Sequence, residues 1–170
     1  MAAIRKVVRI GRAVMRAKAA PLTPAQIVSE PIRRLVAEME ATMHEYEGVG
    51  IAGNQVGEGL AVFVMGLEPG APRCPEGIER TVVFNPSVSF IGEELLEDWE
   101  GCLSVPGLRG RVRRRAKLEL SGLDEQGTPF ARVYEGFPAR VVQHECDHLE
   151  GLVYLDRMQD LKSLCYLSQV

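Results

Sequence analysis

Near the end of the chain stands the sequence Gln143-His144-Glu145-Cys146-Asp147-His148, an HExxH pattern in a segment that we predict to be helical from Pro138 to Gly151. At about 100° per residue, His148 lies roughly 40° around the helix axis from His144 and one turn along it. Both imidazoles can therefore reach one cation. Glu145, about 100° to one side, can touch a water on that cation without being a ligand, whereas Cys146 points about 200° away and reads as a small buried hydrophobe.

A catalytic site of this type has three protein ligands and an open position for water. Cys102 is the candidate for the third ligand. It lies in the stretch 99–107, which is polar and contains Gly and Pro, so we do not expect a core strand there. The alternative for Cys102 is an inert buried thiol. His44 is the remaining histidine of three, and we interpret it as a solvated residue of the first helix.

The remaining elements are predicted from hydrophobic spacing. A helix starts after Ser29-Glu30-Pro31 and ends at Gly48, and a short third helix is expected over residues 161–167. Strand patterns cover residues 60–65, 80–84 (ending at Asn85-Pro86), 111–120 and 131–134. This order favours an α+β domain rather than a βαβ parallel sheet, with short, mostly antiparallel or mixed β-sheets packed around a central helix that carries the HExxH motif.

The composition is that of an ordinary globular chain. It has 170 residues, 46% of them hydrophobic and 25% charged, with a net charge of -3. The length favours a single domain over residues 1–170, and the charge balance gives no reason to expect a membrane or specific DNA as partner. The longest nearly apolar run, residues 60–67, is far shorter than the roughly 20 residues that span a bilayer. The four cysteines are widely spaced without a CxxC pair, so nothing indicates an oxidising compartment.

The first 29 residues carry basic side chains and no acidic one: Arg5, Lys6, Arg9, Arg12, Arg16 and Lys18. This bias is typical of an organelle transit peptide, so an organellar matrix is the minor alternative for the compartment. The stretch has no serine before Ser29 and lacks the apolar core of a secretory signal. We therefore interpret it as a basic arm lying on the domain and expect the protein in the cytoplasm.

Three stretches together resemble the motifs of the peptide deformylases: Gly48–Gln55, Glu100–Ser104 and Gln143–Gly151. They occur in the family's order, and the resemblance extends from about Gly11 to Met158. The family hydrolyses the formyl group from the N-terminal formyl-methionine of nascent chains and releases formate. The resemblance therefore implies a metal-dependent hydrolase whose partners are formyl-methionyl nascent peptides.

The resemblance also implies roles for single residues. Cys102, His144 and His148 would hold one divalent ion, with Fe(II) as the native metal and Zn(II), Ni(II) or Co(II) possible for such a borderline-soft set. Glu145 would take a proton from water and deliver it to the leaving amine. The developing oxyanion would be held by the metal, the Gln55 side-chain amide and the Leu103 backbone N–H.

Substrate contacts follow from the same resemblance. The backbones of Val49 and Gly50 would bind the peptide, and the methionine side chain would enter a pocket lined by Glu100, Phe137 and Val141. Arg109 would contact the peptide further along, and Glu100 could instead be a structural hydrogen-bond acceptor. The chain departs from the family at Gly53, where alanine is usual, and we expect the extra backbone freedom to loosen Gln55.

Alternating arginines between Arg109 and Lys117 favour a solvated strand face, with transient contact to ribosomal RNA as the alternative. Three other functions remain open, one of which is the deformylation of some other N-formyl metabolite. An HExxH metallopeptidase would cleave internal bonds and would normally use histidine or glutamate as third ligand. A catalytically weak deformylase-like protein would bind metal without releasing formate.

Overall fold

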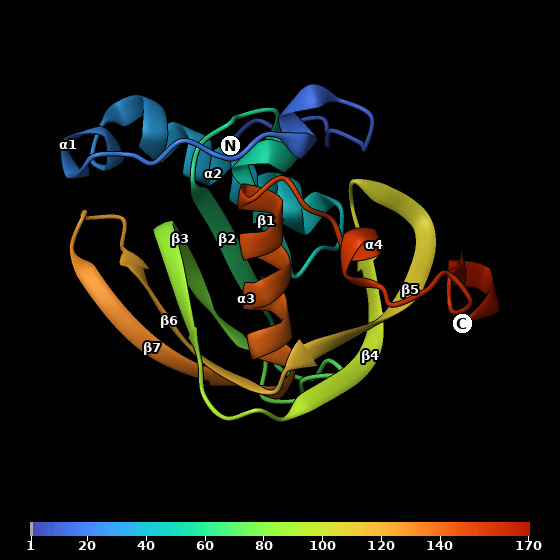
Figure 1. Ribbon diagram of the computed structural model, residues 1–170. Coiled ribbons are helices and arrows are strands. Elements are labelled where there is room, and N and C mark those ends of the chain that lie inside the picture. Colours follow the sequence, from blue (N-terminus) through green and yellow to red (C-terminus); the bar gives the residue numbers. More distant parts are fainter. Residues whose placement is uncertain (1) are drawn as a thin grey trace.

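The computed structural model describes residues 2–170 and contains two antiparallel sheets (Figure 1). The first has five strands, in the spatial order β1 (Gly50–Ala52), β2 (Val62–Leu67), β3 (Ile78–Phe90), β6 (Lys117–Leu123) and β7 (Pro129–Glu135). The second has three: β4 (Leu95–Cys102), β5 (Val105–Arg115) and β8 (Cys165–Tyr166). The predicted α+β class with antiparallel sheets is therefore confirmed.

The helices are α1 (Pro24–Ile27), α2 (Glu30–Glu45), α3 (Gly136–Leu149) and α4 (Tyr154–Arg157), with short 3-10 turns η1 (Ala13–Arg16), η2 (Gly53–Val56) and η3 (Leu167–Gln169). Helix α3 lies between the five-stranded sheet and the β4–β5 pair (Figure 1). Its buried residues Ala139, Val141 and Val142 belong to a core shared with β2, β3 and β6. The HExxH residues are consequently held between both sheets.

Helix α2 agrees closely with the prediction from residue spacing. Its buried side chains include Leu35, Val36, Met39 and Met43, which recur at helical intervals and pack against the other side of the first sheet. His44 is exposed, as expected. No helix over residues 2–170 is long and apolar enough to cross a membrane.

Two strand predictions were wrong in opposite ways: one strand continues through turn-forming residues, and another predicted strand is divided in two. Strand β3 continues past Asn85-Pro86 to Phe90, with positive φ (49°) at Asn85 and a shift of register between Phe84 and Ser87. Such a bulge accommodates both a left-handed residue and a proline, which has no N–H for the ladder. The predicted strand over 111–120 is two strands, β5 and β6, separated at Ala116.

The predicted helix over residues 161–167 is also wrong. Strand β8 and η3 occupy its second half, and the β8 backbone pairs with Leu108 and Arg109 of β5. The apolar side chains that gave the helical pattern do not form a buried face, since Leu161 is 65% and Leu167 is 51% exposed. Pairing with β5 decides the conformation here rather than local propensity.

The basic N-terminal arm lies on the domain, as expected. The Val8 N–H donates to the Gln55 carbonyl (2.8 Å) and the Ile10 N–H to the Ser104 carbonyl (3.0 Å). The arm thereby holds two segments that adjoin the HExxH helix. Arg5 fixes the start of the arm by donating to Glu38 of α2 and to Glu58, each at 2.7 Å.

Glu38 leads to a prediction about stability and pH. Its buried carboxylate accepts from Arg34 (2.9 Å) and Arg5 (2.7 Å), and these hydrogen bonds hold the pKa of Glu38 below its ordinary value. A lowered pKa in the folded state stabilises the fold above the unfolded pKa of about 4.3, and this contribution is lost as pH falls through the folded pKa. We expect Glu38→Gln to lower the free energy of unfolding by about 1 kcal/mol at pH 7. The expected loss is no larger because Arg34 is largely exposed, so solvent screens its ion pair with Glu38.

Urea unfolding of both proteins between pH 7 and pH 3 measures this difference. It should shrink towards the acid end, because the carboxylate is protonated first in the unfolded chain and its contribution to stability is then lost. A deficit of constant size across the range would mean that packing, rather than charge, explains the effect of the substitution.

Candidate active site

Three potential metal-ligating side chains converge from two elements. Cys102 ends strand β4, although no core strand is expected there from the sequence, and His144 and His148 lie one turn apart on α3. The Cys102 Sγ is 3.3 Å from the His148 Nε2, which is 3.2 Å from the His144 Nε2. The ligand atoms of all three residues lie within 4.8 Å of one another, close enough to share one ion.

Partners on the far side of each imidazole fix which nitrogen is free. The His148 Nδ1 lies 3.1 Å from the Leu152 carbonyl, and the His144 Nδ1 lies 3.0 Å from the Glu100 carboxylate. Both partners only accept hydrogen bonds, so each Nδ1 carries a proton, and each Nε2, which faces Cys102, is the atom left to bind a cation. Two imidazole lone pairs and a thiol fit a divalent transition metal and not the oxygen-preferring Mg²⁺ or Ca²⁺.

The electrostatic setting favours an ionised sulfur. Burial alone would raise the pKa of the Cys102 thiol, but the charges and hydrogen bonds of His148 and His144 outweigh it and hold the pKa well below its ordinary value. Burial opposes ionisation of Glu100 as well, yet Arg114 and His144 keep its pKa far below the usual range. The site therefore favours a thiolate at Cys102 and an ionised carboxylate at Glu100.

Glu145 lies beside this cluster with an unused carboxylate oxygen. It is 3% exposed, and its Oε2 has no hydrogen-bond partner. Burial raises the pKa of Glu145 to about 7, although His144 and His148 act in the opposite direction. The other oxygen lies so close to Gly50 that a Cβ at residue 50 would overlap it. A buried carboxyl group that titrates near neutrality is suited to general acid and base chemistry.

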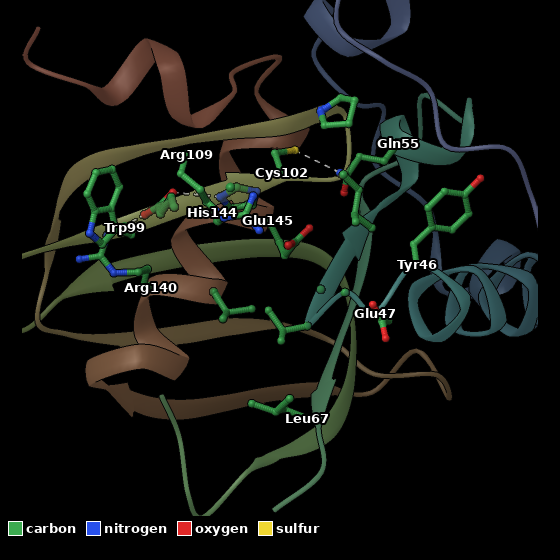
Figure 2. A pocket seen from close by; sticks show the side chains of 18 of the residues that line it. Tyr46, Glu47, Gln55, Leu67, Trp99, Cys102, Arg109, Arg140, His144 and Glu145 are labelled. Atoms are coloured by element: carbon green, nitrogen blue, oxygen red, sulfur yellow. Dashed lines mark hydrogen bonds and ion pairs between the residues drawn. The ribbon is translucent and has the colours of Figure 1, made fainter. Parts of the chain in front are cut away.

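Gln55 approaches the same cluster from η2, opposite α3 (Figure 2). Its Oε1 accepts the Ala52 N–H (2.9 Å), which leaves the Nε2 3.4 Å from the Cys102 Sγ and 3.3 Å from the Ser104 Oγ. Gln55 is 2% exposed and held at both ends of its amide, against the expectation that Gly53 loosens it. A Cβ at Gly53 would lie 2.6 Å from the Leu60 carbonyl oxygen, so glycine is required there by packing.

These residues lie at one side of a cavity of about 560 Å³ (Figure 2). Its lining contains every predicted substrate-contacting residue: Val49, Gly50, Glu100, Phe137 and Val141. It also contains Leu103 and Arg109. The Arg73 guanidinium lies 4.6 Å from the centre of the Phe137 ring and closes one part of the wall. A cavity of this size is large enough for a short peptide segment.

Glu100 is buried and hydrogen-bonded, so it is not freely accessible to a side chain that enters the cavity. It is 5% exposed, and its two oxygens accept from Arg114, Arg140 and His144. This corresponds to the alternative considered from the sequence, a structural acceptor. Sequence reasoning missed Arg140. Its position four residues before His144, on the same face of the helix, is the signal that could have found it.

Of the arginines between Arg109 and Lys117, some lie on the surface and one lies in the interior. Arg111 and Arg113 are about half exposed and lie near Glu97, with the Arg113 Nε 3.1 Å from its carboxylate. Arg114 points the other way and is buried, bonded to Glu100 (2.8 Å) and Asp147 (2.6 Å). The expected solvated face therefore exists, but Arg114 belongs to the interior of the site.

Comparison with known families agrees with the motifs. The family model described as polypeptide deformylase matches residues 4–164. Peptide deformylase 1 of Prochlorococcus marinus is 38% identical over 170 aligned positions, which cover 99% of this chain and 88% of that protein. Peptide deformylase 1 of Bordetella pertussis is 44% identical over 140 positions, covering 79% and 77% of the two chains.

Solved structures show the same similarity in three dimensions. A class I type b peptide deformylase from Acinetobacter baumannii with bound Met-Ala-Ser has a TM-score of 0.87 at 36% identity, covering 93% of this chain and all (100%) of that one. A peptide deformylase from Synechococcus elongatus in complex with actinonin has a TM-score of 0.80 at 32% identity, covering 91% and 78%.

Proposed function

The chain belongs to the polypeptide deformylase family and is a hydrolase of that family; we propose that it removes the formyl group from the N-terminal formyl-methionine of nascent polypeptides and releases formate. The observation that carries this proposal is the meeting of Cys102, His144 and His148 beside the unpartnered carboxylate of Glu145. Residues 1–170 would act as one domain, built around α3 as the central helix that carries the HExxH motif.

Cys102, His144 and His148 would hold one divalent ion, with Fe(II) as the proposed native metal. When bound, such an ion lowers the pKa of water and withdraws electron density from a carbonyl oxygen. The orientation of both imidazoles by Glu100 and Leu152 supports this assignment, because their free nitrogens already face the sulfur.

Glu145 is the group that moves protons. We infer that its carboxylate takes a proton from the attacking water and passes it to the amine nitrogen as the C–N bond of the formamide breaks. The products are then formate and a peptide with a free N-terminus. A pKa of about 7 lets the same carboxyl group accept and donate near neutrality.

Gln55 and Leu103 would stabilise the oxygen of the reacting formyl group. The bond from Ala52 to the Gln55 Oε1 turns the NH₂ group of Gln55 towards Cys102, where a developing negative charge would lie. The Leu103 backbone N–H directly follows the metal-ligating candidate Cys102 in the chain. One donor of this kind is worth roughly 3 kcal/mol in comparable acyl-transfer sites.

The peptide would lie extended along β1. This strand pairs with β2 alone among the described strands, and Val49 and Gly50 border the cavity at its other side. An extended chain can bind such an edge through backbone groups. The methionine side chain would enter the space beside Phe137 and Val141. The Acinetobacter relative binds Met-Ala-Ser, which supports a substrate of this chemistry.

We propose the cytoplasm as its compartment and transient contact with ribosomes, because its substrates would be nascent chains. Arg111 and Arg113 are the exposed cations of β5 that would serve such contact, although Glu97 partly neutralises them.

A formate-release assay on formyl-Met-Ala-Ser tests the function. The protein is prepared anaerobically with Fe(II), and the metal content of the same sample is measured, because a thiolate ligand is open to oxidation. We expect one metal ion per chain and equal amounts of released formate and free amine. Metal binding without formate would mean that catalysis is lost, and cleavage of internal peptide bonds would indicate a metallopeptidase instead.

A further inference from the structure

Two side chains on consecutive turns of α3 bind one carboxylate of β4. Arg140 and His144 are four residues apart and therefore lie on one face of the helix (Figure 2). The Arg140 Nη1 donates to the Glu100 Oε1 (2.8 Å), and the His144 Nδ1 lies 3.0 Å from the Oε2 of the same residue. Helix α3 thus holds Glu100 at two points, one of them through a candidate metal ligand.

This attachment matters because Glu100 is two residues before Cys102. The pairing of β4 with β5 is irregular between these two residues, since the register shifts between Glu100 and Cys102. The ladder by itself therefore does not determine where the Cys102 sulfur lies relative to α3. The link from Glu100 to the helix supplies that constraint at the end of the strand.

Arg140 is itself anchored to both strands of the hairpin. Its Nη1 also donates to the Val112 carbonyl (2.9 Å) and its Nη2 to the Leu96 carbonyl (2.6 Å), and the residue is 5% exposed. The planar, forked guanidinium serves all three acceptors at once, which the single ammonium of lysine cannot do in the same geometry. Arg140 therefore ties α3, β4 and β5 together one turn from His144.

We propose that Arg140 is a positioning residue that sets the distance between the Cys102 sulfur and the imidazoles of α3, and thereby how firmly the site retains its cation. This inference rests on the proposed metal centre. Arg114 makes a parallel link from Glu100 to Asp147 of α3. Loss of Arg140 should therefore weaken cation retention without abolishing it.

The test uses the Co(II)-loaded protein and measures how fast cobalt is lost to excess EDTA, together with the thiolate-to-cobalt absorption band. Arg140→Lys keeps a buried positive charge beside Glu100 and Arg140→Met removes it. We expect cobalt loss to be roughly 10-fold to 100-fold faster, the usual effect of outer-sphere partners of metal ligands, with a shifted absorption band.

Two controls separate positioning from general stability. Arg157→Met removes a charge from the ion pairs that Asp147 makes with Arg114 and Arg157. Arg157 binds Asp147 (2.6 Å), is 47% exposed and does not contact Glu100. Glu38→Gln lowers stability through α2, where Glu38 bonds to Arg5 and Arg34 and to neither Glu100 nor the three candidate ligands. Both should retain cobalt at the wild-type rate.

Wild-type retention and an unshifted band in both Arg140 variants would overturn the proposal. So would an equal loss of cobalt in the two controls, or a failure of even Arg140→Lys to fold, because Arg140 would then support the whole domain. A wild-type protein that binds no cobalt would instead refute the metal centre itself, and with it the proposed function.

Discussion

Glu145→Gln is expected to lower kcat for formyl-Met-Ala-Ser by roughly 10²-fold to 10⁴-fold, the usual contribution of a positioned general acid or base. Glutamine has nearly the same shape, so it fits against Gly50, but its amide cannot accept the proton of water at neutral pH. Because Glu145 is not among the three converging ligands, the variant should keep one equivalent of metal. Formate release and metal content, measured on the same sample, test both expectations.

Glu150→Gln is the matched control. Glu150 follows the end of α3, its side chain is 55% exposed, and it pairs with Lys18 (2.9 Å) rather than with any residue of the site. The same chemical change there should leave kcat and metal content at wild-type values. Near-normal turnover by Glu145→Gln would refute the proposed proton transfer, and loss of metal would mean that Glu145 supports the ion directly.

The local parts of the site could be predicted from the sequence because they depend on one helix. The 3.6-residue period alone brings His144 and His148 to one face, whatever the rest of the chain does. The same argument predicted α2 and the outward direction of His44. Such inferences need no knowledge of distant partners.

Features that depend on distant partners were harder to predict. The glycines and proline around Cys102 argue against a core strand, yet β4 reaches Cys102 through pairing with β5. Asn85-Pro86 looked like the end of a strand, but a bulge carries β3 through it. Arg114 stands among exposed arginines, and only the positions of Glu100 and Asp147 show why it is buried. In each case a tertiary contact outweighs the local pattern.

The third ligand is accordingly the part of the site that most needs a direct test. We expect Cys102→Ala to lower the affinity for divalent metal by more than the roughly 100-fold that loss of an outer partner costs, and to reduce formate release in proportion. The substitution removes the sulfur that lies 3.3 Å from the His148 Nε2, and a pair of imidazoles alone holds a divalent ion weakly. Titration with Co(II) measures the affinity, and the thiolate-to-cobalt band should disappear.

Cys146→Ala provides the control, because Cys146 lies on α3 between the two histidines and packs against the hydrophobic core instead of the site. Burial raises the pKa of the Cys146 thiol far above its ordinary value, so it supplies no thiolate. This variant should bind cobalt with the wild-type affinity and the wild-type band. If Cys102→Ala kept both, the sulfur would be no ligand, and the chemistry would have to be explained by the two histidines and a residue other than Cys102.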